Sequence, residues 1–302
     1  MNRRGFVAAA VVGVGAATAA CSTSDRTGPA ASMTPASTGD PGALTAEVFQ
    51  SADGSCFQLR SVGAGDLVVI HPSLARGAAD FDQVAVLLAE AGYRVVSFDP
   101  RAAGATRDAP ARPDATVTLD DFAADLREII SANGGRAHIV GHDFGNRVAR
   151  RLATLSPEVV RSIVLWGAGA GVPAPEAVRI LAAVTSPTTP APEFKKAVAD
   201  GFFAPGNDAS VWYTGWYPAA ALLETQASGA TAVSLYEGGG TAPLLIVQGG
   251  QDAIAPPAGS LALQKKIGDR ASRTVIDGAG HCMVAEQPRR LAEATAEFLR
   301  RH

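Results

Sequence analysis

The stretch that decides the fold spans residues 137–150 and reads AHIVGHDFGNRVAR. Its first residues are typical of a buried strand, and a helix-forming run follows Gly145. Between them, Gly141 and Gly145 flank Asp143 in the pattern G-x-D-x-G. Glycines relieve crowding at a sharp strand-to-helix turn, which holds the central side chain above the sheet. The stretch therefore predicts a turn that presents Asp143 at a helix N-terminus, where an anion is favoured.

Strand-like and helix-like segments alternate on both sides of this turn. Apolar runs typical of buried parallel strands occur at residues 67–71, 93–99, 162–167, 244–249 and 273–276. Helical spacing or capping signals occur at residues 80–91, 118–133, 145–155, 261–267 and 289–301. This alternation predicts an α/β fold with a mostly parallel central sheet flanked by helices. Residues 168–240 break into short helical pieces with proline and glycine, and we expect a small helical cap there.

Two further polar residues follow later strands of the predicted sheet. Asp252 comes just after the strand at residues 244–249, and His281 lies in a glycine-containing loop after residues 273–276. A carboxylate at such a strand end can orient a histidine and stabilise its cation. Taken alone, Asp252 could instead cap a helix, and His281 could be an ordinary hydrogen-bonded loop residue. The order Asp143, Asp252, His281, with each residue after a strand, favours a catalytic set.

This order resembles that of the α/β-hydrolase fold superfamily, and the resemblance covers nearly the whole chain beyond residue 43. His71-Pro72-Ser73 resembles the family's histidine-glycine loop, with proline in place of glycine. The resemblance implies that the backbone amides of Ser73 and Phe144 are the oxyanion donors. Residues 99–106 resemble the family's D-x-R-G-x-G-x-S loop, and we expect Arg101 to pair with a carboxylate rather than act on substrate.

In this superfamily the sharp turn, here residues 141–145, is called the nucleophile elbow, and its central residue is usually serine. Aspartate at that position makes the chain similar to epoxide hydrolases and haloalkane or haloacid dehalogenases. In that branch a carboxylate attacks a saturated carbon, and a histidine-activated water hydrolyses the resulting alkyl-enzyme ester. The resemblance implies that Asp143 is the nucleophile, that His281 activates water and that Asp252 orients His281. A carboxylate suits the first role because it is ionised near neutral pH without a base.

The expected cap holds the richest aromatic cluster of the chain, at residues 211–217, which read VWYTGWY. Epoxide hydrolases of this branch protonate the epoxide oxygen with cap tyrosines, and the related dehalogenases often hold halide with a tryptophan beside the nucleophile. Phe144 occupies that neighbouring position in this chain. The resemblance implies substrate binding by Trp212, Tyr213, Trp216 and Tyr217. The alternative is that this cluster only packs the cap against the body.

Two other functions remain open on the sequence. The protein could be an ester or lactone hydrolase of ordinary type with a replaced elbow residue. It could also be a non-catalytic small-molecule-binding protein, like the hydrolase-fold hormone receptors. The presence of Asp252 and His281 favours chemistry over binding alone. No metal-ligand cluster or cofactor fingerprint occurs, so neither a metal nor a cofactor is expected.

The composition of the chain excludes other classes of partner. Its 302 residues include 26 Lys and Arg against 29 Asp and Glu, which gives a formal net charge of −3. A pI near 6.0 offers no electrostatic footprint for nucleic acid. Three cysteines are too few for a disulfide framework. We therefore expect a small-molecule substrate and no nucleic-acid partner.

The N-terminus has the features of a bacterial export signal. Arg3 and Arg4 resemble the twin-arginine signal, and residues 6–20 are apolar but shorter than the roughly 20 residues that span a bilayer. Residues 18–21, Thr-Ala-Ala-Cys, resemble a lipoprotein cleavage box. We expect a signal peptide at residues 1–20, lipidation of Cys21, a flexible tether at 21–42 and a hydrolase domain at 43–302. The protein is then expected in the cell envelope, with membrane contact only through a lipid on Cys21.

Overall fold

One β-sheet forms the centre of the protein, for which a computed structural model describes residues 32–33, 43–109, 116–169 and 173–302. The strand order is β1-β2-β3-β5-β4-β6-β7-β8-β9. The strands are β1 Ser32–Met33, β2 Thr45–Gln50, β3 Cys56–Val62, β4 Asp66–His71, β5 Tyr93–Phe98, β6 Ala137–His142, β7 Val160–Trp166, β8 Leu244–Gly249 and β9 Ala271–Ile276. Strands β4 to β9 pair in parallel, whereas β2 and β3 run antiparallel to their neighbours. The mostly parallel sheet predicted from the sequence is confirmed.

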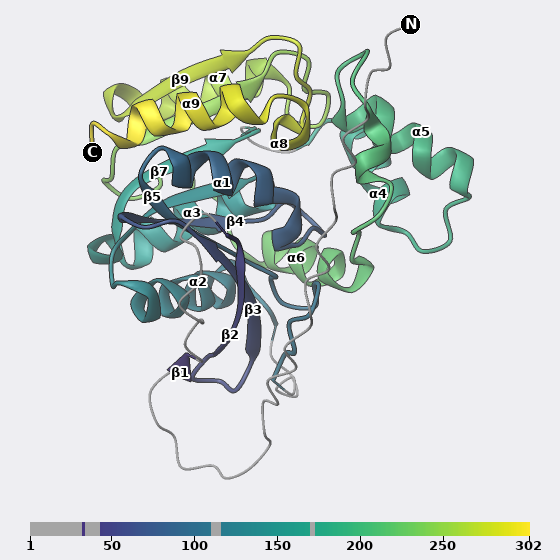
Figure 1. Ribbon diagram of the computed structural model, residues 1–302. Helices are drawn as coiled ribbons and strands as arrows, with labels where there is room; N and C mark the ends of the chain where they lie inside the picture. Colours follow the sequence, from purple (N-terminus) through teal and green to yellow (C-terminus); the bar gives the residue numbers. More distant parts are fainter. Residues whose placement is uncertain (1–31, 34–42, 110–115, 170–172) are drawn as a thin grey trace, which may run out of the picture.

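Helices cover both faces of this sheet (Figure 1). They are α1 Asp82–Glu90, α2 Leu119–Asn133, α3 Phe144–Leu155, α4 Pro175–Thr185, α5 Ala191–Phe202, α6 Pro218–Ala230, α7 Pro257–Ile267, α8 Met283–Glu286 and α9 Pro288–Leu299. Helices α1 and α9 pack on one face, and α2 and α3 pack on the other. Val68 and Ile70 of β4 face the first pair of helices, whereas Val69 faces the second. This alternation is the period of two that a strand buried on both faces requires.

The segment between β7 and β8 carries α4, α5 and α6, which is where the sequence predicts a cap. In Figure 1, α4 and α5 project from one end of the sheet, and α6 lies below them. Pro175 and Pro218 are the first residues of α4 and α6. Proline is favoured at a helix start because that position needs no backbone N–H donor. The proline-rich pattern that marks this segment in the sequence thus marks helix starts.

The N-terminal residues bring one difference from the sequence prediction. Ser32 and Met33, inside the predicted flexible tether, pair antiparallel with Gln50 and Phe49 of β2. The edge of β2 presents backbone groups that an extended segment of any composition can pair with. The predicted signal peptide and Cys21 lie outside the described residues. Within the described ranges, no helix combines the length and the apolar composition that crossing a membrane requires.

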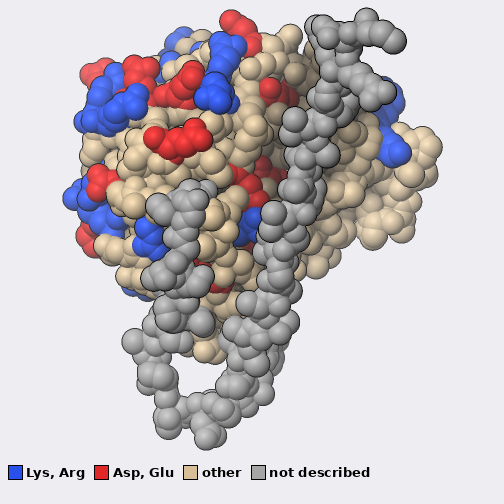
Figure 2. All heavy atoms as spheres, viewed as in Figure 1, with Lys and Arg blue, Asp and Glu red and all other residues tan. Residues whose placement is uncertain are grey.

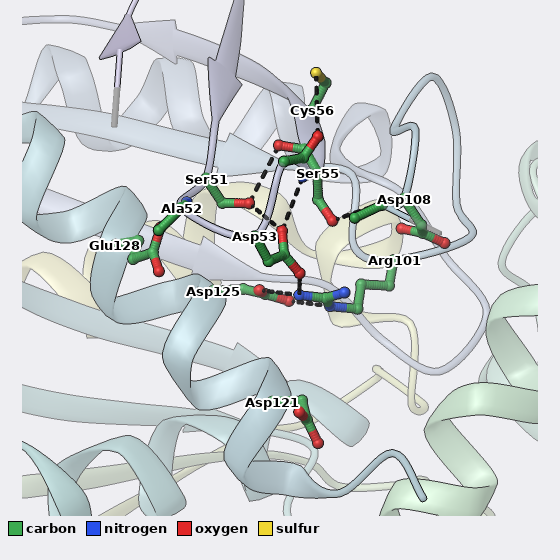
Figure 3. A network of polar contacts seen from close by, with 12 residues as sticks. Ser51, Ala52, Asp53, Ser55, Cys56, Arg101, Asp108, Asp121, Asp125 and Glu128 are labelled. Atoms are coloured by element: carbon green, nitrogen blue, oxygen red, sulfur yellow. Dashed lines mark hydrogen bonds and ion pairs between the residues drawn. The ribbon is translucent and has the colours of Figure 1, made fainter. Parts of the chain in front are cut away.

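Arg101 lies at the centre of a polar network on the body of the protein (Figure 3). Its guanidinium donates to both carboxylate oxygens of Asp125 on α2, each at 2.6 Å, and to Asp53 in the β2–β3 turn at 2.8 Å. Ser51 Oγ and the Ser55 amide in turn donate to Asp53. Arg101 thus pairs with carboxylates, as predicted, and joins three segments that are distant in the sequence.

Candidate active site

Asp143 occupies the turn between β6 and α3 in a backbone conformation that is rare for a non-glycine residue. Its φ is 48° and its ψ is −104°. Such conformations persist only where the surrounding structure fixes them, and they cluster at functional sites. Here the Asp143 amide donates to the carbonyl of Trp166 on β7 at 3.2 Å, and the Asn146 amide donates to the Asp143 carbonyl at 3.0 Å. Neighbouring strand and helix therefore hold the turn in place.

The two flanking glycines explain why this turn can close. A Cβ atom on Gly141 would lie 2.4 Å from the carbonyl carbon of Gly145. A Cβ atom on Gly145 would lie 2.4 Å from the carbonyl oxygen of His71 on β4. Both obstacles are backbone, which cannot move aside as a flexible side chain can. Only glycine fits at these two positions, as the pattern around Asp143 indicates.

The Asp143 carboxylate faces the loop that follows β4. Its Oδ2 atom accepts long hydrogen bonds of 3.4 Å from the Leu74 backbone amide and from the Ser73 hydroxyl. The sequence predicts the Ser73 amide for this place, but the structure brings the next amide to Asp143. The chain turns here, because the Arg76 amide donates to the Ser73 carbonyl and Ala75 has a φ of 58°. Phe144, the other predicted donor, is the first residue of α3 and lines the same cavity as Asp143.

Asp252 and His281 come together inside the protein. His281 Nδ1 lies 2.9 Å from Asp252 Oδ2, and neither side chain is exposed to solvent. A carboxylate only accepts hydrogen bonds, so Nδ1 carries the proton and Nε2 is the basic nitrogen of the neutral ring. Asp252 also accepts from the Ile254 and Ala255 amides and from Gln248 Nε2. These four hydrogen bonds fix the carboxylate, and the carboxylate fixes the imidazole.

The charge of His281 is set by opposing effects. Burial lowers the pKa of His281, because a charged imidazole is unfavourable away from water. The Asp252 carboxylate, and with it the Asp143 carboxylate, raises this pKa by more than burial lowers it. The pKa of His281 therefore rises to about 8. His281 Nε2 is buried and has no hydrogen-bond partner in the described part of the chain. A Cβ atom on Gly167, which follows Trp166 and lines the Asp143 cavity, would lie 3.1 Å from His281 Nδ1. His281 and Asp143 therefore lie near each other at the end of β7.

His142 belongs to this candidate site but is not predicted from the sequence. Its ring lies 4.9 Å from the His281 ring, measured between centroids, at an angle of 31°. His142 Nε2 donates to the His281 carbonyl at 2.9 Å. Burial, and then the neighbouring His281, lower the pKa of His142 to about 4. His142 therefore supports His281 as a neutral ring. Its place beside Asp143 in the turn is the only sequence signal for this role.

A cavity of about 740 Å³ opens above Asp143. Apolar side chains of α4 and the β8–α7 loop form much of its wall, together with polar groups from α3 and α6. Among its lining residues are Leu74, Asp143, Phe144, Arg147, Arg150, Val178, Leu181, Thr225, Ser228, Tyr236, Glu237, Ile254 and Lys266. Arg150 is buried, its pKa is lowered to about 10 by burial, and no carboxylate of the described residues pairs with it or with Arg147.

The aromatic cluster at residues 211–217, which the sequence predicts to bind substrate, does not line the Asp143 cavity in the described part of the chain. Trp212 and Trp216 pack against the buried Arg76 guanidinium, whose Cζ atom is 4.3 Å and 4.7 Å from their ring centroids. Tyr213 contacts Phe194 of α5, with ring centroids 6.5 Å apart. None of Trp212, Tyr213, Trp216 and Tyr217 is among the described residues that line the Asp143 cavity. The structure therefore favours the packing interpretation, because the buried cation gathers the indole rings.

The surface of the protein carries both acidic and basic side chains. Figure 2 shows acidic and basic side chains interspersed on the face in view. Within the parts of the chain that the structure describes, no group of three or more His, Cys, Asp or Glu is arranged to hold a metal ion.

Known proteins resemble this chain in sequence. The protein named "Putative carbamate hydrolase RutD" of Variovorax paradoxus (strain S110) is 34% identical over 113 residues, which are 37% of this chain and 41% of that protein. The Mus musculus protein named epoxide hydrolase 4 is 34% identical over 74 residues, which are 24% of this chain and 20% of that protein. The chain thus spans less than half the length of either relative.

Solved structures resemble this chain over most of its length. The esterase EaEST of Exiguobacterium antarcticum superposes with a TM-score of 0.70 at 18% identity, over 84% of this chain and 98% of that one. A serine hydrolase of carbazole degradation, the CarC enzyme, gives 0.67 at 22% identity, over 86% of this chain and 100% of that one. A family model described as alpha/beta hydrolase fold matches residues 66–288. The chain therefore belongs to the alpha/beta hydrolase fold family.

Proposed function

We propose that this hydrolase acts on a small organic molecule through an ester formed on Asp143. The observation that carries the proposal is the Asp143 carboxylate, held at a strained turn by the Leu74 amide and next to the buried Asp252–His281 pair. A serine at this position would need a base to remove its proton, whereas a carboxylate does not. The site thus suits attack on a saturated carbon of an epoxide or an alkyl halide.

In the first step Asp143 Oδ1 attacks the carbon, and the bond from that carbon to its leaving oxygen or halogen breaks. Oδ2 becomes the carbonyl oxygen of the resulting ester. The Leu74 amide already donates to Oδ2. Oδ1 has no hydrogen-bond partner among the described residues. We therefore assign Oδ1 as the attacking atom.

In the second step water attacks the ester carbon, Cγ of Asp143, while His281 Nε2 takes the proton of that water. Negative charge develops on Oδ2, opposite the Leu74 amide, and Asp252 stabilises the imidazolium. The ester C–O bond then breaks, and the departing alcohol oxygen takes the proton back from His281. One oxygen of water remains in Asp143, whose acid proton passes to the surroundings.

Single-turnover reactions in heavy-oxygen water test this route. The probes are hexene oxide and bromohexane, with epoxyhexanoate and bromohexanoate as carboxylated counterparts. Mass spectrometry of the peptide that contains Asp143 should show one heavy oxygen after one turnover. Product formed without label in Asp143 would remove the nucleophile assignment.

An ester or lactone hydrolase of ordinary type is the alternative that the named carbamate hydrolase relative favours. Activity on esters that survives Asp143→Ala would identify it. A protein that binds the probes without converting any of them would be the non-catalytic binding protein. Turnover that Asp143→Ala abolishes excludes both.

We also propose that the chain is exported by its twin-arginine signal and lipidated at Cys21. The support is the N-terminal sequence alone, from Arg3 to Cys21. Labelled palmitate in the producing bacterium should enter the wild type but not Cys21→Ser. A lysine pair in place of Arg3 and Arg4 should keep the protein in the cytoplasm, and normal export of that variant would contradict the proposal.

A further inference from the structure

Glu224 of α6 is a buried carboxyl group that the reaction described above does not use. Its side chain is fully buried. Oε2 accepts a hydrogen bond of 2.6 Å from the Ala75 amide, and Oε1 has no partner in the described part of the chain. None of the ion pairs among the described residues includes Glu224. A buried carboxyl group without a cation is far more stable as the neutral acid.

Glu224 and Asp143 are held by consecutive amides of one turn. The Leu74 amide donates to Asp143, and the Ala75 amide donates to Glu224. Because consecutive Cα atoms are about 3.8 Å apart, the two carboxyl groups lie within about 10 Å of each other. Thr225 and Ser228, next to Glu224 and one turn beyond it on α6, line the Asp143 cavity, as Leu74 does. Glu224 itself is not among these lining residues, so its carboxyl group lies buried directly behind the wall that Leu74, Thr225 and Ser228 form, on the turn that also holds Asp143.

The charge of Asp143 reinforces the neutral state of Glu224. Burial, and then the neighbouring Asp143 charge, raise the pKa of Glu224 well above its ordinary value. When two carboxyl groups lie this close, ionisation of one raises the pKa of the other, so that one is the anion and the other the neutral acid. Asp143 is then the anion and Glu224 the acid. Oε2 accepts from Ala75, which leaves Oε1 as the oxygen that carries the proton.

We propose that Glu224 donates its Oε1 proton to the oxygen that leaves the attacked carbon, so that the substrate class of this site is an epoxide. This inference rests on the Asp143 ester mechanism. An acid beside the nucleophile helps a leaving oxygen most, because the oxygen departs as a strongly basic alkoxide unless it is protonated. Bromide is a weak base that leaves without a proton and needs at most a hydrogen-bond donor, which the side-chain amide introduced by Glu224→Gln would still supply. The described lining of the cavity also contains no tryptophan whose indole N–H could hold a halide.

The protons balance over one cycle. As Asp143 Oδ1 bonds to the carbon, the ring C–O bond breaks and the oxygen takes the Glu224 proton, which leaves Glu224 as a carboxylate. Water then hydrolyses the ester, with His281 taking a proton from water and returning it to the alcohol oxygen. Asp143 emerges as a carboxylic acid, and its proton passes to Glu224 directly or through water. Epoxide and water become a diol, and all three side chains return to their first states.

The test isolates the first step in a His281→Gln background, in which the ester accumulates because no base activates water. Ester on Asp143 is followed by mass spectrometry, with hexene oxide against bromohexane and epoxyhexanoate against bromohexanoate. Glu224→Gln keeps an oxygen for the Ala75 amide but removes the acid proton. It should slow ester formation from the epoxides by about 100-fold or more, the usual size of general acid catalysis. Ester formation from the bromides should not change.

Two variants serve as comparisons. Glu47→Gln changes another buried glutamate, which accepts from Ser61 in the β2–β3 hairpin away from the cavity, and should alter neither rate. Tyr236→Phe removes the competing donor, since Tyr236 is the tyrosine among the described lining residues. An epoxide-specific loss in Tyr236→Phe, with none in Glu224→Gln, would overturn the assignment. Equal slowing of epoxide and bromide in Glu224→Gln would make Glu224 a structural residue and would also overturn it.

A solvent isotope effect covers the case in which Glu224→Gln does not fold. With Glu224 intact, ester formation from the epoxides should be slower in heavy water than in ordinary water, whereas ester formation from the bromides should not. Equal rates in both solvents would overturn proton donation in this step. Absence of any ester on Asp143 from all four probes is a different result, because it removes the Asp143 mechanism itself.

Discussion

The Nδ1 atom of His281 lies 2.9 Å from Oδ2 of Asp252 in the protein interior, where neither side chain reaches solvent. Solvent does not screen this pair, so the carboxylate acts strongly on the imidazole. The pairing fixes the ring and leaves Nε2 as the basic nitrogen, and in the proposed reaction it would stabilise the cation that forms when His281 deprotonates water. Removal of either partner should therefore change both the rate and its dependence on pH.

Ester hydrolysis should require neutral His281. The pKa of His281 is raised to about 8 in the free protein, where the Asp143 charge contributes. The ester carries no charge on Asp143, so during ester breakdown the base form should be lost below a somewhat lower pH. The single-turnover rate of ester breakdown should thus decline about tenfold per pH unit on the acid side. In Asp252→Asn, burial still lowers the pKa of His281 and the Asp252 carboxylate no longer raises it, so the decline should begin at a lower pH. An unchanged pH profile in Asp252→Asn would contradict this account.

The glycines of the elbow should tolerate no side chain. Gly145→Ala places its Cβ atom 2.4 Å from the His71 carbonyl oxygen. We expect the free energy of unfolding in urea to fall by about 3 kcal/mol, as in other overpacked interiors. Gly229→Ala is the matched control, because its Cβ atom meets nothing within 4 Å on α6. That change should stabilise by up to about 1 kcal/mol. Equal effects of the two variants would refute the steric argument.

Arg101→Met should destabilise the fold without touching the site. The change leaves Asp125, whose side chain is 6% exposed, without its cation. Breaking one side of a buried ion pair costs about 3–5 kcal/mol, which urea denaturation should detect. The control is Arg179→Met, which removes an ion pair with Glu176 in which both side chains are largely exposed. We expect no measurable change there.

Tyr213 and Tyr217 should not be proton donors. Tyr213→Phe and Tyr217→Phe remove hydroxyl groups that are not among the described lining of the Asp143 cavity. Epoxide turnover at saturating substrate should therefore stay near the wild-type rate in both variants. A large loss of turnover in either one, with the fold intact by circular dichroism, would restore the role that the sequence analysis expected.

The two arginines of the cavity should favour substrates that carry an anionic group. Arg150 is buried beside Tyr236 and lacks a carboxylate partner among the described residues. Arg150→Met should raise the KM of epoxyhexanoate about 10- to 100-fold, the range for a charged hydrogen bond, and leave that of hexene oxide unchanged. Arg151→Met is the control, because Arg151 pairs with Asp120 instead. A uniform change for both substrates would show that Arg150 only supports the fold.

Local sequence patterns determined the fold and the positions of Asp143, Asp252 and His281. A strand, a glycine-flanked aspartate and a helix define the Asp143 turn, because the spacing of Gly141 and Gly145 meets a local steric demand. The approach of Asp252 to His281 follows from the sheet, since parallel strand ends meet at one edge. The pairing of Arg101 with carboxylates was equally predictable.

The tertiary structure alone decided what surrounds Asp143. The choice of the Leu74 amide over that of Ser73 depends on the turn after β4, where Ala75 has a positive φ. Trp212 and Trp216 of the cap pack on Arg76, and neither is among the described residues that line the cavity. Glu224 meets the same turn across 149 residues of sequence. No local periodicity encodes such contacts, because they arise from packing between irregular segments and the body of the protein. Burial, which follows from that packing, raises the pKa of Glu224.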